Sequence, residues 1–203
     1  MTIRHTLLLI VSLLSFLATP AMASDGPGTK TVRDANSKLS AMLQSGATSK
    51  TNEKAQLQQA RSKLGGFLDI EELGKLALKD HWQGLSPEKQ KEFTTLLRDL
   101  IETNYLKGLR ANVKYKVKYL GEESQGKFLL VHTIVQSKRR GRPVKIEIDY
   151  LLSKQGKSWR TFDIKTDGIG LVENYRAMFN KIIAKSGFDA LLSKMRKKLA
   201  KLK

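Results

Sequence analysis

Three aspartates around one predicted strand are the residues whose type best suits acid and base chemistry. Asp163 and Asp167 flank the end of a strand expected over residues 158–166, and Asp149 lies in the strand before it. Two carboxyl groups held close together can act as a general acid and a general base. The sequence supplies no nucleophile elbow or oxyanion loop to accompany them. We therefore interpret all three as surface or turn carboxylates and expect that the protein is not an enzyme.

Residues 121–127 match the first seven positions of a phosphate-binding loop. The next position of that pattern requires Ser or Thr at the start of a helix, whereas here it is Phe128 and a strand is expected to follow. Glu122 and Glu123 would also repel a phosphate group. The segment therefore predicts a hairpin connection between two strands.

Ligands for a metal ion are scarce in this chain. It contains no cysteine and three histidines, which excludes thiolate metal sites and cysteine nucleophiles. His81 falls at a predicted helix end and His132 within a predicted strand, and neither has a carboxylate or a second histidine at ligand spacing. We expect no metal site and no cofactor.

The strongest chemical signal in the sequence is its positive charge. The 203 residues include 37 Lys and Arg against 19 Asp and Glu, a net charge of +18 at pH 7, and this balance favours anionic partners. Basic residues gather at a predicted hairpin tip and on the polar face of the last predicted helix, where they suit docking to an anionic membrane or an acidic protein. Simple solvation is the alternative. The docking candidates are Lys138, Arg139, Arg140, Arg142, Lys194, Arg196, Lys197 and Lys198.

The first 23 residues have the pattern of a cleavable export signal. Arg4 precedes an apolar run over residues 7–18, and small residues at 21 and 23 predict cleavage after Ala23. The apolar run is shorter than the ~20 residues that a membrane-spanning helix needs. Cleavage would remove one basic and no acidic residue and leave a net charge of +17. Because an exported compartment holds little DNA or RNA, we expect no nucleic-acid partner.

The periodicity of apolar residues predicts a single α+β domain over residues 24–203. Helical spacing over residues 29–110 gives way to strand spacing over 113–166, and helical spacing returns over 170–203. In the first helical region, helices are expected over residues 29–44 and 51–64, then from an N-cap at Asp69, and finally from Ser86 to Leu109.

Four strands are expected, and the loops between them are short. Such connections permit hairpins, so we expect a four-stranded antiparallel twisted sheet packed against N-terminal and C-terminal helices. The second strand is apolar on both faces, and the helices carry long apolar stripes. Because this apolar surface exceeds the need of one helix-on-sheet layer, we expect an apolar cavity between the layers. The strands are expected over residues 113–119, 128–137, 144–152 and 158–166.

Several motifs from Leu85 onward are typical of one known family. The most specific stretch is residues 167–176, Asp-Gly-Ile-Gly-Leu-Val-Glu-Asn-Tyr-Arg. The others are residues 85–88, 117–123, 141–144, 148–150, 162–164 and 187–191, with Phe93, Tyr105, Trp159 and Phe179. In these motifs the sequence resembles the MlaC family, also called the toluene-tolerance auxiliary proteins. Family members usually have Ser where this chain has Gly170, and Gly-Ile-Asp-Gly-Leu where it has residues 187–191.

The resemblance implies a function as well as a fold. It implies a monomeric periplasmic protein whose apolar cavity binds a phospholipid, with no chemistry performed on the lipid. It also implies three partners: an outer-membrane lipoprotein complex, the inner-membrane substrate-binding ring of an ABC transporter, and, transiently, an anionic membrane surface. Such a carrier maintains outer-membrane lipid asymmetry. The alternative is an exported basic adaptor that binds a protein partner and has a fully packed core.

The residues expected to line the cavity follow from the apolar faces of the strands and of the facing helices. Arg176 is the first candidate for meeting the lipid phosphate at the mouth. The lining candidates are Leu97, Ile101, Tyr105, Val117, Tyr119, Ile146, Ile148, Tyr150, Phe162, Ile164, Leu171, Val172, Tyr175 and Phe179.

Overall fold

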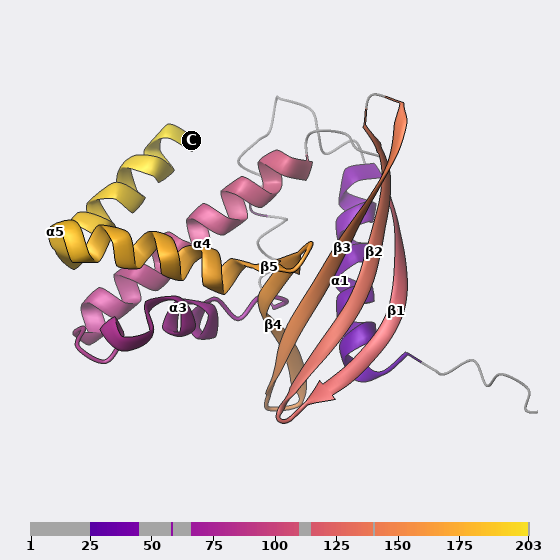
Figure 1. Cartoon of the computed structure of the whole chain (residues 1–203), viewed down its shortest axis with the longest axis horizontal. Coiled ribbons are helices and arrows are strands. Elements are labelled where there is room, and N and C mark those ends of the chain that lie inside the picture. The colour runs from indigo at the N-terminus through magenta and orange to yellow at the C-terminus, as the bar shows by residue number, and fades with distance from the viewer. Residues whose placement is uncertain (1–24, 45–57, 59–65, 110–114, 140, 203) are drawn as a thin grey trace, which may run out of the picture.

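The computed structural model describes residues 25–44, 58, 66–109, 115–139 and 141–202 (Figure 1). The predicted export signal and the docking candidate Arg140 lie outside the described residues, and so does the helix expected over residues 51–64 except for Gln58, which is helical. The side chains of Tyr105 and Arg139 lie outside them as well.

The helices begin where the sequence places capping residues. The Asp69 carboxylate accepts a hydrogen bond from the Glu72 backbone N–H at 3.0 Å, which confirms the predicted N-cap. Ser86 caps the next helix more loosely, with its hydroxyl 3.4 Å from the Lys89 N–H. The first segment consists of α1 (Pro27–Gln44), α3 (Ile70–Leu78), the 3₁₀ turn η2 (Lys79–His81) and α4 (Pro87–Leu109).

The C-terminal segment is one long helical element with a break. It is assigned as α5 (Leu171–Leu202), but Gly187 inside it has φ 79°, a left-handed conformation that a helix cannot contain. Two helices therefore meet at Gly187.

The sheet has five strands, one more than the four predicted. All neighbours are antiparallel, in the order β1-β2-β3-β4-β5. The added strand has two residues, too few to give an alternating pattern. It returns along β4 because Asp167 and Gly168 both have positive φ, 48° and 83°, as a tight hairpin turn requires. The strands are β1 (Tyr115–Gln125), β2 (Phe128–Arg139), β3 (Arg142–Gln155), β4 (Ser158–Thr166) and β5 (Ile169–Gly170).

The sheet has two different faces. We call the face that packs against α1 the inner face, because Val32 of α1 is buried against Val131 and Leu152 there. The opposite face is the outer face. Helices α3, α4 and α5 form a separate group beside β4 and β5 (Figure 1).

Most of the buried apolar side chains of the described residues fall into two clusters. The helical cluster joins α3, α4 and α5 and contains Phe93 and Phe179, whose rings lie 5.4 Å apart. The sheet cluster joins α1 to the inner face. The two clusters adjoin at neighbouring residues, since Phe67 packs against the sheet cluster and Leu68 against the helical cluster. This segment is fixed to β4 by two backbone hydrogen bonds to Thr161, both 2.8 Å long.

Two carboxylates of the sheet fasten helices to it. Asp163 of β4 accepts hydrogen bonds at Oδ1 from the Ile164 N–H at 2.9 Å and from the Val172 N–H at 3.0 Å, and thereby caps α5. Glu122 of β1 accepts a hydrogen bond from the Thr29 N–H and thereby caps α1. The helices on either side of the sheet are thus positioned by strand residues.

Candidate functional site

The inner face of the sheet changes character along its length. At one end Val131 and Leu152 are fully covered beneath α1. At the other end Val117, Val135 and Ile146 form one row across three strands, and all three are only half-buried. The described part of the chain therefore leaves a partly open apolar surface on the inner face.

The predicted lining residues are divided between the two clusters. Those from the strands lie on the inner face, with Tyr150 buried and the others half-buried: Val117, Tyr119, Ile146, Ile148, Tyr150 and Ile164. Those from the helices belong to the helical cluster or pack against it: Leu97, Ile101, Leu171, Val172, Tyr175 and Phe179. The structure thus places these residues in two separate apolar clusters.

Phe162 is placed elsewhere. Its ring lies 4.9 Å from that of Phe128, on the outer face. The reason is a register shift between Leu151 and Leu152, which places Phe162 as an extra residue in β4 and reverses the alternation of the strand at that point.

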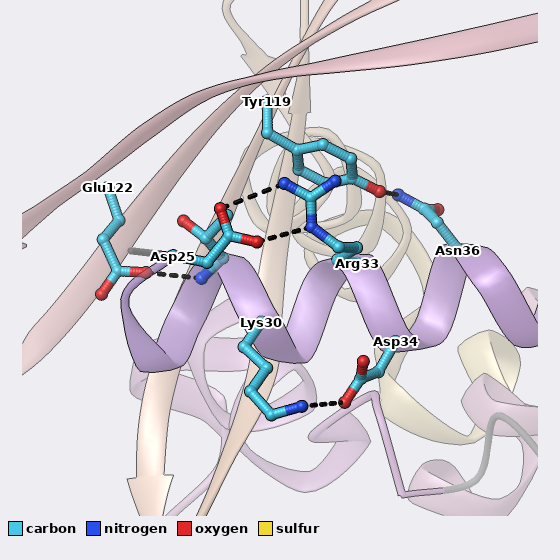
Figure 2. A network of polar contacts seen from close by, with 8 residues as sticks. Asp25, Lys30, Arg33, Asp34, Asn36, Tyr119 and Glu122 are labelled. Atoms are coloured by element: carbon cyan, nitrogen blue, oxygen red, sulfur yellow. Dashed lines mark hydrogen bonds and ion pairs between the residues drawn. The ribbon is translucent and has the colours of Figure 1, made fainter. Parts of the chain in front are cut away.

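A polar group lies within the inner face beneath α1 (Figure 2). Asn36 donates a hydrogen bond through Nδ2 to the Tyr119 hydroxyl at 3.1 Å. Burial raises the pKa of Tyr150 to about 12, and it also raises the pKa of Tyr119. The sequence interpretation placed the tyrosines on this face but missed Asn36, a polar residue on the apolar side of the first helix.

The N-terminal half of α1 is held on β1 by charged groups as well (Figure 2). Arg33 lies over the Tyr119 ring at 3.9 Å and donates two hydrogen bonds to Asp25, at 2.6 and 3.0 Å. These hydrogen bonds hold the pKa of the Asp25 carboxyl below its usual value. The Glu122 cap sits one turn away, so several polar contacts join one end of α1 to one strand.

Arg176, the candidate for the lipid phosphate, bridges two helices. Its Nε and Nη2 donate hydrogen bonds to the Leu76 carbonyl oxygen at 3.1 and 2.8 Å. That carbonyl lies in the last turn of α3, where backbone acceptors lack helical partners. The guanidinium therefore ties α5 to α3.

The docking candidates form two exposed groups. Lys138 and Arg142 flank the β2–β3 turn, and the exposed lysines 116, 118 and 145 extend this group along the strands. Lys194, Lys197 and Lys198 are exposed on the second half of α5. Arg196 differs from them because it is hydrogen-bonded to Glu92 of α4.

The three aspartates considered for catalysis have separate structural roles. Asp149 forms a hydrogen bond with His132 on the neighbouring strand, with 2.9 Å between Asp149 Oδ1 and His132 Nδ1. Asp163 caps α5, and Asp167 accepts a hydrogen bond from the Glu147 N–H at 3.1 Å. Within the described ranges, no group of three or more His, Cys, Asp or Glu residues is arranged to hold a metal ion. No helix in those ranges is long and apolar enough to cross a bilayer.

The fold and the site together define an α+β protein whose distinctive feature is an apolar sheet face bordered by a helical cluster. The sequence profile described as MlaC protein matches residues 33–197. The chain therefore belongs to the MlaC family, as the motifs predicted.

Two relatives illustrate the match. The intermembrane phospholipid transport system binding protein MlaC of Haemophilus influenzae is 21% identical over 137 residues, which cover 66% of this chain and 64% of that protein. A solved structure of a phospholipid-binding protein from Ralstonia solanacearum, in complex with a phospholipid, has a TM-score of 0.75 and 21% identity. The alignment covers 88% of this chain and 99% of that one. At this identity the structural likeness establishes a shared fold.

Proposed function

We propose that this protein is a periplasmic phospholipid carrier whose acyl-chain cavity lies between the inner face of the sheet and the helices. Membership of the MlaC family supports this function. So do the two relatives, since one is named for phospholipid transport and the other is a phospholipid-binding protein seen with its lipid.

The single observation that carries the proposal is the half-buried row of Val117, Val135 and Ile146 on the inner face. A soluble domain gains stability by covering such a surface, and an acyl chain would cover it. A lipid with two chains has on the order of 30 methylenes, and leaving them in water would cost roughly 24 kcal/mol. A carrier that shields them is therefore needed for transfer between membranes.

The partners follow from the same proposal. The carrier receives or delivers lipid at an outer-membrane lipoprotein complex and at the inner-membrane substrate-binding ring of an ABC transporter, and it performs no chemistry on the lipid. The exposed lysines of α5 and of the β2–β3 hairpin supply attraction to an anionic bilayer, worth about 1 kcal/mol per basic residue near the surface. For Arg176 to contact the lipid phosphate, the mouth of the proposed cavity must lie at the junction of α3 and α5, where this side chain is held.

The test is to extract the purified protein with organic solvent and to measure phospholipid by mass spectrometry. About one lipid per chain is expected. Absence of lipid after gentle purification would favour the protein-binding adaptor, and turnover of a phospholipid or ester would favour a hydrolase.

A substitution on the inner face makes this test specific. Ile148→Glu should abolish lipid retention while the protein stays folded, because Ile148 is only half-buried and packs at the margin of the sheet cluster. Leu120→Glu is the matched control, since Leu120 is 53% exposed at a bulge of β1. Val172→Glu is expected to abolish retention too, but its site is buried in the helical cluster and its folding must be checked first. Unchanged retention in Ile148→Glu would remove Ile148 from the cavity.

A further inference from the structure

The polar group beneath α1 includes a third tyrosine whose hydroxyl is unsatisfied. Tyr115, Tyr119 and Val117 share the inner face of β1, because side chains two residues apart in a strand point to the same side. The Tyr115 hydroxyl oxygen is buried and has no hydrogen-bond partner among the described residues. A buried phenol normally finds such a partner, because leaving it unpaired is costly.

The three phenols and the Asn36 amide form a neutral group. Burial raises the pKa of both Tyr119 and Tyr150, and the phenol of Tyr115 raises both further. All three side chains lie on the inner face of the sheet. Among the described residues, Arg33 lies over the Tyr119 ring and is paired with Asp25. The group therefore offers hydrogen bonds without net charge.

The position of this group matches one part of a phospholipid. Tyr119 and Tyr150 lie toward the fully buried end of the inner face, and Tyr115 lies on the other side of the half-buried row of Val117, Val135 and Ile146. In a diacyl phospholipid, neutral oxygens adjoin apolar chains at the ester carbonyls. An ester carbonyl accepts hydrogen bonds and carries no charge, so neutral phenol donors can bind it without the cost of burying an ion.

We infer that the Tyr115 hydroxyl, supported by Tyr119, Tyr150 and Asn36, donates a hydrogen bond to an ester carbonyl of the bound lipid. This inference rests on the proposed function and adds a lipid class to it: the carrier prefers ester-linked over ether-linked phospholipids. An ether analogue has the same headgroup and chain length but lacks the carbonyl acceptor. Its binding would leave the buried phenol unpaired.

The experiment is a competition between two lipids. The full-length mature chain is stripped of lipid and equilibrated with vesicles that contain equal amounts of dioleoyl phosphatidylglycerol and its dioctadecenyl ether. Bound lipid is then measured by mass spectrometry. The wild-type protein should hold the ester form in about fivefold or greater excess, the factor expected for one buried hydrogen bond. Tyr115→Phe should bring the ratio close to one, because neither lipid then gains a hydrogen bond from this position.

Ser153→Ala is the matched control. It also removes only a buried hydroxyl oxygen with no partner in the described structure, but Ser153 pairs with Phe128 and lies on the outer face. Its ratio should equal that of the wild-type protein. Equal binding of ester and ether lipids by the wild-type protein would overturn the inference while leaving the carrier function intact, and so would an unchanged ratio in Tyr115→Phe. Failure to bind either lipid would instead refute the proposed function.

Discussion

Removing the Glu122 carboxylate should loosen α1 from the sheet. A bulge in β1 brings the Glu122 carboxylate to the N-terminus of α1. The register shifts between Tyr119 and Gly121, and Gly121 has φ 123°. The shift turns Glu122 to the inner face, where it accepts the hydrogen bond from the Thr29 N–H. A Cβ on Gly26 would meet the Glu122 carboxylate, which would then have to shift.

The magnitude follows from two effects on the first turn of α1. Loss of a helix cap costs about 0.5–2 kcal/mol, and loss of a negative charge at a helix N-terminus costs about 0.3–1 kcal/mol. The two overlap, so Glu122→Ala should lower the free energy of unfolding by about 1–2 kcal/mol. For a chain of this size, the thermal midpoint should fall by about 2–8 °C.

The assay is urea unfolding of the lipid-free protein, together with hydrogen exchange of the α1 amides. Glu123→Ala is the control, because Glu123 is exposed and its partners are Gln125 and, at 3.9 Å, His132. It should change stability by less than about 0.5 kcal/mol. Equal effects of the two substitutions, or unchanged exchange of α1 in Glu122→Ala, would show that the carboxylate does not hold the helix.

Three further predictions concern other parts of the molecule. Arg176→Met should lower the free energy of unfolding by about 1.5–3 kcal/mol in urea titrations, because it removes both hydrogen bonds to the Leu76 carbonyl. Replacing Lys194, Lys197 and Lys198 by Gln should weaken sedimentation with anionic vesicles at low salt by about 1 kcal/mol per lysine and leave neutral vesicles unaffected. Burial raises the pKa of Tyr150 to about 12, against ~10 in the unfolded chain. The stability that this neutral phenol contributes is therefore complete below pH 10 and is lost as the pH rises through 12. The free energy of unfolding should fall by up to about 1.4 kcal/mol per pH unit over this range. Unfolding measured at each pH should show this fall in the wild-type protein and not in Tyr150→Phe.

The pattern of helices and strands could be predicted because most elements have a regular apolar period and a capping residue. The start of α1 is an exception. The helix begins at Pro27, a position that suits proline, whereas the apolar spacing predicts a start at residue 29. The end of β1 is a second exception. The bulge at Gly121 interrupts the alternation that marks a strand, so the prediction ends the strand at residue 119, whereas it continues to Gln125.

The candidate site could be predicted only as faces, not as contacts. Alternation placed Val117, Ile146 and Ile148 correctly on one side of the sheet. It could not place Phe162, because an extra residue in β4 reverses the alternation there. Nor does periodicity say what a long side chain will bond, and Arg176 reaches a backbone carbonyl of α3 that is 100 residues away in sequence.

The division of the apolar interior into two clusters matters for a carrier. A bilayer shields acyl chains as well as a protein does, so the direction of transfer depends only on the difference between the cavity and the membrane. A cavity enclosed by one rigid core would hold its lipid too firmly to release it. Here α1 and the sheet form one packed unit and α3, α4 and α5 form another, and they adjoin at Phe67 and Leu68. For the proposed carrier we expect the cavity to open by a change in the separation of these two units, since each has a core of its own. The polar contacts of Glu122 and Arg33 hold α1 on the sheet and not on the helical unit.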